Sequence, residues 1–210
     1  MRAALIAVTG TVLALAGCSS GAAQPPRADS TAPVLAPGRP GEQARTLSPG
    51  EAATAVPGPT ANAADITYVQ DMIVHHRQAL DMAVLAPSRA ASAQLKTLAD
   101  RIKAAQGPEI QYMTTWLRGQ DQAVPDHHAG HEGMPGMATP EQMEALKAAQ
   151  GEEFDRLFLQ LMIRHHEGAI TMSEQVLLKG SHVKIEELAT DVSVTQAAEI
   201  RRMQEMQAKS

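Results

Sequence analysis

The sequence predicts an all-α protein, an antiparallel four-helix bundle formed from two duplicated helical hairpins. Aromatic residues make up only 2% of its 210 residues, while alanine, leucine, glutamine and glutamate abound, a composition that favours helices over strands. Apolar residues recur at helical spacing. A whole set of residues in the first half also recurs 90 positions later. Such a repeat indicates an internal duplication, and two equivalent hairpins pack as a bundle.

The repeated residues are a paired histidine with its methionine neighbours, and a second group about thirty positions further along. In each copy one methionine precedes the first histidine by three positions and another follows it by seven. The equivalent pairs are Met72 and Met162, His75 and His165, His76 and His166, Met82 and Met172, Gln106 and Gln196, Glu109 and Glu199, and Met113 and Met203.

Residues 1–18 are typical of a bacterial lipoprotein signal peptide. Arg2 gives a positive start, and an apolar run too short to span a bilayer follows it. The run ends Leu15-Ala16-Gly17-Cys18, which resembles a lipobox, so Cys18 is the expected lipidation site. An ordinary cleaved signal with a nearby cysteine is the alternative. Cys18 is the only cysteine, so any metal must be bound by histidine, methionine and carboxylate side chains.

Residues 19–62 form a segment rich in proline, alanine and glycine. Eight of the 13 prolines lie here, and no hydrophobic periodicity is present. Such a segment cannot bury enough apolar surface to offset its ordering entropy. We expect a disordered tether between the membrane anchor and a folded domain at residues 63–208.

The first hairpin is expected at residues 63–118. Its first helix runs from Ala63 to Ala86 before Pro87, and its second begins after Ser88 as the N-cap. Gly107 and Pro108 interrupt the second helix, where we expect a kink.

Residues 119–138 form a loop rich in histidine and methionine, and residues 139–208 form the second hairpin. Thr139 and Pro140 indicate the start of a short helix that breaks at Gly151. A long helix then runs from residue 152 to 179, with Gly180 as its left-handed stop, and the last helix covers residues 182–208.

Helical phase predicts which histidines face the core. At 100° per residue, His76 and His166 lie at the centre of the apolar face of their helices, and His75 and His165 lie at its edge. Gln106 and Gln196 fall on the buried stripe of the following helices, and Glu109 and Glu199 flank it.

Soft thioethers beside imidazoles favour copper, above all Cu(I). For a single buried methionine, packing is the ordinary explanation, and inward histidines and glutamines could satisfy each other without metal. The loop supports the metal hypothesis separately, because histidine-rich tracts are typical of metal binding. Its candidate ligands are His127, His128, His131, Met134 and Met137.

At these residues the chain resembles the bacterial domain-of-unknown-function 305 family, over about residues 65–206. The second copy carries Phe158-Leu159 before Met162-Ile163-Arg164-His165-His166, then Met172, and later Gln196, Glu199, Ile200 and Met203. The resemblance implies a ferritin-like fold, export, and copper binding linked to copper tolerance.

The favoured hypothesis is a non-enzymatic, extracytoplasmic copper-binding lipoprotein, anchored to the outer face of the cell membrane, that buffers, sequesters or transfers Cu(I) or Cu(II). Other transition metals and an unknown protein partner for metal transfer stay open, whereas the net charge of −5 gives no reason to expect nucleic acid. One alternative is a ferritin-like di-iron or di-manganese oxidoreductase. Its Glu-x-x-His motifs are absent, since Tyr112 and Arg202 follow Glu109 and Glu199 by three positions. The other is a metal-free structural or interaction module.

Overall fold

The computed structural model describes residues 34–36, 43–48, 50–51, 60–126 and 133–209. The chain divides into two compact units, residues 1–56 and 57–210. The predicted signal sequence, Cys18 and the three loop histidines lie outside the described residues. No helix among the described residues has the length and apolar character needed to cross a bilayer.

In the first unit, β1 (Val34–Ala36) pairs antiparallel with β2 (Arg45–Leu47), with Leu35 opposite Thr46. The prediction of a disordered tether over residues 19–62 stays a prediction, and these two short segments within it are extended. Their apolar and β-branched side chains favour extended backbone.

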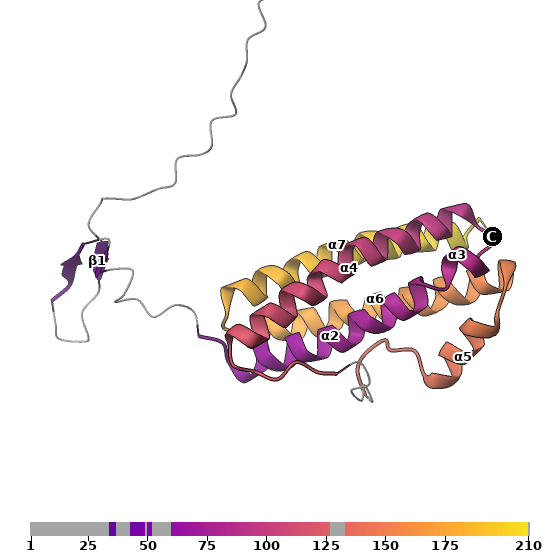
Figure 1. Ribbon diagram of the computed structural model, residues 1–210. Coiled ribbons are helices and arrows are strands. Elements are labelled where there is room, and N and C mark those ends of the chain that lie inside the picture. Colours follow the sequence, from indigo (N-terminus) through magenta and orange to yellow (C-terminus); the bar gives the residue numbers. More distant parts are fainter. Residues whose placement is uncertain (1–33, 37–42, 49, 52–59, 127–132, 210) are drawn as a thin grey trace, which may run out of the picture. The chain divides into compact units, whose positions relative to one another are not determined.

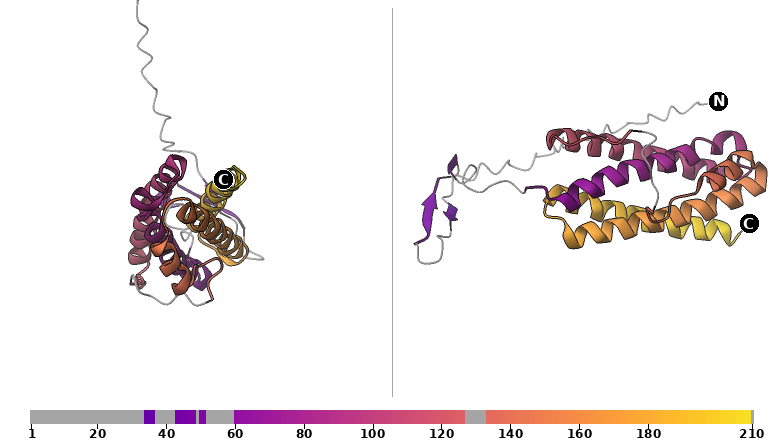
Figure 2. Two further views of the ribbon diagram at one scale, coloured as in Figure 1. Left: turned by 90° about the vertical axis from the view of Figure 1, so that its right-hand side faces the viewer. Right: turned by 90° about the horizontal axis from the view of Figure 1, so that it is seen from below.

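The second unit is helical, which confirms the mostly helical prediction. Four long helices, α2, α4, α6 and α7, run lengthwise beside one another, with the short α3 and α5 at one end (Figures 1 and 2). Their bounds are α2 Ala63–Ala83, α3 Ala86–Arg89, α4 Ala93–Gly119, α5 Pro140–Ala148, α6 Gly151–Lys179 and α7 Val183–Gln207.

The predicted start of the second long helix is wrong. Ser92, not Ser88, caps α4, because its side chain accepts the Leu95 N–H at 3.2 Å, whereas Ser88 and Pro87 belong to α3. Proline is tolerated in a first helical turn. α4 also continues through Pro108. The cap of α5 follows the prediction, since Thr139 and Gln142 form a capping box.

Gly180 ends α6 in an extended conformation with φ −71°, not in the predicted left-handed one. A Cβ at this position would lie 2.5 Å from Asp65 Oδ1 and 2.8 Å from the Val176 carbonyl oxygen. Gly180 is therefore required for the close approach of α2, and not for backbone conformation.

Two buried aspartates, 90 positions apart, hold the turns between helices. Asp65 at the start of α2 accepts the Ser181 N–H at 3.1 Å, in the turn between α6 and α7. Asp155 at the start of α6 accepts the N–H groups of Ala91 and Ser92 at 3.1 and 2.8 Å, in the turn before α4. Each half thus fixes the turn of the other half, and Asp155 sets the start of α4 at Ser92.

Candidate metal centre

The histidine layer, which consists of His75, His76, His165 and His166, lies midway along α2 and α6. All four side chains have no exposed surface. The rings of His75 and His165 face each other across the two helices, with centroids 3.7 Å apart and planes tilted by 37°. His75 and His165, which were expected at the edge of the apolar face, are as fully buried as His76 and His166. α2 packs against both α4 and α6, so its buried face is wider than the apolar stripe alone indicates.

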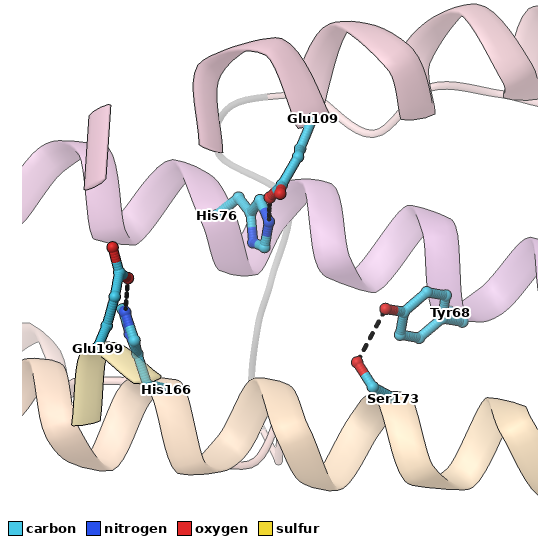
Figure 3. A network of polar contacts seen from close by, with 6 residues as sticks. All are labelled: Tyr68, His76, Glu109, His166, Ser173 and Glu199. Atoms are coloured by element: carbon cyan, nitrogen blue, oxygen red, sulfur yellow. Dashed lines mark hydrogen bonds and ion pairs between the residues drawn. The ribbon is translucent and has the colours of Figure 1, made fainter. Parts of the chain in front are cut away.

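The other two histidines pair with glutamates of the neighbouring helix. His76 Nε2 lies 2.7 Å from Glu109 Oε2, and His166 Nε2 lies 2.7 Å from Glu199 Oε2 (Figure 3). A carboxylate accepts, so Nε2 carries a hydrogen in both rings, and Nδ1 is the ring nitrogen through which a metal could be bound. Both Nδ1 atoms are buried and have no hydrogen-bond partner among the described residues. A carboxylate that orients an imidazole in this way is the usual second partner of a metal-binding histidine.

His165 is held in its neutral form. Burial lowers its pKa well below the ordinary value of 6.5, and the neighbouring His75 and His166 lower it further. A neutral imidazole can bind a metal without first losing a proton.

The amides of Gln106 and Gln196 are also buried, each with 2% of its surface exposed. Neither amide has a hydrogen-bond partner among the described residues. The alternative in which histidines and glutamines satisfy each other is therefore not what the structure shows. Buried polar atoms without a partner are rare in native proteins, and they fit a centre that holds a bound metal or water.

Six methionines of the repeat lie in the core on either side of the histidine layer. They are at most 7% exposed. One core cluster contains Met72, Met113 and Met172, and the other contains Met82, Met162 and Met203. Each trio draws one methionine from each of three helices, and the 90-residue offset exchanges the two trios. Packing and ligation are both compatible with this arrangement.

Residues 133–138, the strap, cross the surface of α2 and α6 beside the histidine layer. His75 Nε2 donates to the Pro135 carbonyl oxygen at 3.0 Å. The Gln78 side chain accepts the Ala138 N–H at 2.7 Å and donates to the Ala138 carbonyl oxygen at 2.9 Å. The strap therefore places the half-buried Met134 and Met137 next to the layer.

Close backbone packing fixes the strap on α6. A Cβ at Gly168 would collide with the Pro135 carbonyl oxygen, and a Cβ at Gly136 would collide with the Arg164 carbonyl oxygen. Gly136 also has a φ of +77°, which favours glycine. The prediction that His127, His128 and His131 bind metal stays a prediction, because these residues lie outside the described part of the chain.

Sequence reasoning missed Gln78 and Gly168, which hold the strap, and Asp65 and Asp155, which hold the turns. The aspartates could have been found, since they obey the 90-residue offset. Gln78 and Gly168 are equivalent positions with different residues, so a search for repeated residues does not find them. Within the described ranges, His, Cys, Asp and Glu side chains form no group of three or more that could hold a metal ion.

Comparisons with known proteins identify the family. The model of the family "Domain of unknown function (DUF305)" matches residues 65–207. The chain belongs to this family. No curated protein matches it.

Several solved structures are similar over about two thirds or more of this chain. A protein from Streptomyces coelicolor, described as secreted, is 30% identical, with 70% of this chain and 91% of that chain covered and a TM-score of 0.64. A fragment from Deinococcus radiodurans is 32% identical, with coverage of 73% and 100% and a TM-score of 0.66. CopM in its Cu(I)-bound form is 31% identical, with coverage of 69% and 96% and a TM-score of 0.59. CopM in its Cu(II)-bound form is 34% identical, with coverage of 68% and 94% and a TM-score of 0.59.

Proposed function

We propose that this protein is a non-enzymatic, extracytoplasmic copper-binding lipoprotein that buffers, sequesters or transfers copper. The observation that carries the proposal is the buried histidine layer between two methionine trios. The similarity to CopM, which has been crystallised with both Cu(I) and Cu(II), supports copper as the metal.

The proposed ligands are imidazole nitrogens of the histidine layer together with thioethers of the methionine trios. Nδ1 of His76 and of His166 is the proposed donor atom of these two rings, because Nε2 already donates to a glutamate, and His165 is held neutral by burial. Glu109 and Glu199 are assigned an orienting role, because their oxygens already accept from Nε2 at 2.7 Å. Bound copper would supply a positive charge that compensates the buried lone pairs, and soft thioethers would favour Cu(I).

The proposed architecture is a four-helix bundle of two duplicated hairpins. α2 packs on α4 and α6 packs on α7, while α2 and α6 contact each other. The exchange of the methionine trios by the 90-residue offset supports an origin by duplication. A consequence is that the two halves of the centre have the same ligand types.

Competition titrations of residues 57–210 with a Cu(I) chelator and with a Cu(II) chelator test the function. We expect copper affinity tighter than micromolar, which corresponds to about −8 kcal/mol. Absence of such binding in both oxidation states would contradict the proposal and favour a metal-free structural module. Bound iron or manganese with oxidase activity in protein purified from its own cells would favour the ferritin-like alternative.

The anchor requires its own experiment. Cys18 to Ala in the full chain should abolish incorporation of a labelled fatty acid and release the protein from the membrane fraction. Unchanged membrane association after this substitution would contradict lipidation at Cys18.

A further inference from the structure

A surface pocket lies at the end of α2 and α6 that is remote from α5. Its volume is about 320 Å³, and its lining includes Ala64, Thr67, Asp71, Met172 and Lys179. Met172 belongs to one of the methionine trios and is 7% exposed. The pocket thus brings solvent to a proposed ligand of the metal centre.

The equivalent place at the other end is closed. Ninety positions after Ala64, Thr67 and Asp71 stand Phe154, Leu157 and Leu161. Leu146 of α5 packs in the same core cluster as Phe154 and Leu161, and it has no exposed surface. Met82, the equivalent of Met172, likewise has none. Large apolar side chains and an added helix therefore cover one trio completely, whereas small and polar residues leave Met172 of the other trio 7% exposed.

A polar contact borders the open pocket. The Tyr68 hydroxyl lies 2.9 Å from the Ser173 hydroxyl (Figure 3), and burial raises the pKa of the Tyr68 phenol, which keeps it neutral. Phe158 and Ala83 stand at the equivalent positions and are fully buried. Two charged groups face the pocket, the Asp71 carboxylate and the Lys179 ammonium.

We propose that this pocket is the port through which a soft monovalent cation enters and leaves the metal centre, with Asp71 attracting the cation and Met172 receiving it. The inference rests on the proposed function. An oxygen anion at the mouth and a thioether inside suit a cation that sheds water before soft ligands bind it. The charge of Lys179 opposes entry, so the two side chains set the rate in opposite directions.

Ag(I) is a suitable probe, because it is soft, monovalent and stable to oxidation. Its transfer from a weak chelator into residues 57–210, and its removal by a strong chelator, are followed by stopped flow at low ionic strength. Equilibrium affinity is measured on the same samples. Absence of Ag(I) and Cu(I) binding by the unmodified protein would refute the proposed function itself, and with it the port.

Three variants change the port and one serves as a control. Asp71→Asn should slow loading several-fold, and Lys179→Gln should accelerate it, with salt reducing both effects. The double variant Ala64→Phe with Thr67→Leu copies the closed end and should slow both loading and removal, with little change in affinity. Glu205→Gln removes an exposed carboxylate at a different surface pocket, between α4 and α7, and should change neither rate.

Equal loading rates in the unmodified protein, Asp71→Asn and Lys179→Gln would overturn the port, provided that the unmodified protein binds Ag(I). Asp71→Asn and Lys179→Gln lie at the surface, so they test the port even if the double variant Ala64→Phe with Thr67→Leu is destabilised. Slowing by Glu205→Gln as large as that by Asp71→Asn would show that net charge, and not this pocket, controls entry.

Discussion

The two halves of the helical unit agree at the histidine layer and differ where the strap crosses it. His76 pairs with Glu109 as His166 pairs with Glu199, at the same distance of 2.7 Å. Gln78 in the first half binds the strap backbone through two hydrogen bonds, whereas Gly168, its equivalent, provides the space that the strap fills. The strap occurs once, whereas the histidine layer is built from two equivalent halves. The equivalent positions that contact the strap therefore have different residues. The repeated residues therefore indicate the metal centre, and the unequal ones indicate what covers it.

The largest expected effect is on copper affinity, and it compares the histidine layer with the loop histidines. Replacing the four histidines of the layer by leucine, which has a similar volume, should weaken copper binding at least about a hundredfold, or roughly 2.8 kcal/mol. Replacing His127, His128 and His131 by asparagine should remove only weaker sites. Chelator competition on both proteins measures the difference. If copper stays bound after the fourfold change, the function belongs to the loop.

The next effect tests whether the glutamates orient the histidines. Glu109→Leu or Glu199→Leu leaves a buried Nε2–H without its acceptor and should lower copper affinity about ten- to a hundredfold. Glu109→Gln retains an acceptor oxygen and should have a much smaller effect. Metal titrations with each variant give the comparison. Equal losses for leucine and glutamine would indicate that the carboxylate is itself a ligand.

A smaller effect concerns the strap. Gly168→Ala places a Cβ against the Pro135 carbonyl and should displace the strap, with a loss of about 1–3 kcal/mol in the free energy of unfolding. Gly107→Ala is the matched control, because nothing lies within 4 Å of a Cβ there; it should be neutral or stabilise α4 by up to about 1 kcal/mol. Urea denaturation measures both variants. A Gly168→Ala protein as stable as the control would show that the strap does not pack as described.

The sequence predicts well those features that depend on local periodicity and on the repeat. Helix type, the Thr139 cap and the burial of His76 and His166 follow from spacing alone. The start of α4 could not be chosen between Ser88 and Ser92, because the deciding contact comes from Asp155, more than sixty positions later in the chain. Local sequence contains no information on which serine a distant carboxylate will reach.

The sequence also could not predict which of the four histidines pair most closely. Helical phase places His75 and His165 at an edge because it counts apolar neighbours on one helix at a time. The edge of α2 is covered by the edge of α6, so the two histidines become the most closely paired rings of the layer, 3.7 Å apart. Burial at an interface depends on both helices, and each helix alone underestimates it.

The smallest expected effect is the pH dependence of the metal-free protein, and it concerns His165. The folded state holds the pKa of His165 below its ordinary value of 6.5, mainly through burial, so the unfolded chain binds more protons there as the pH falls. Stability from this group is therefore complete above about pH 6.5 and decreases as the pH falls below it, towards the lowered pKa of the folded state. Thermal unfolding between pH 7.5 and 5 should show a falling midpoint, and His165→Leu should flatten the decrease. An unchanged slope in His165→Leu would assign the acid sensitivity to other groups and would contradict the neutral, metal-ready state of His165.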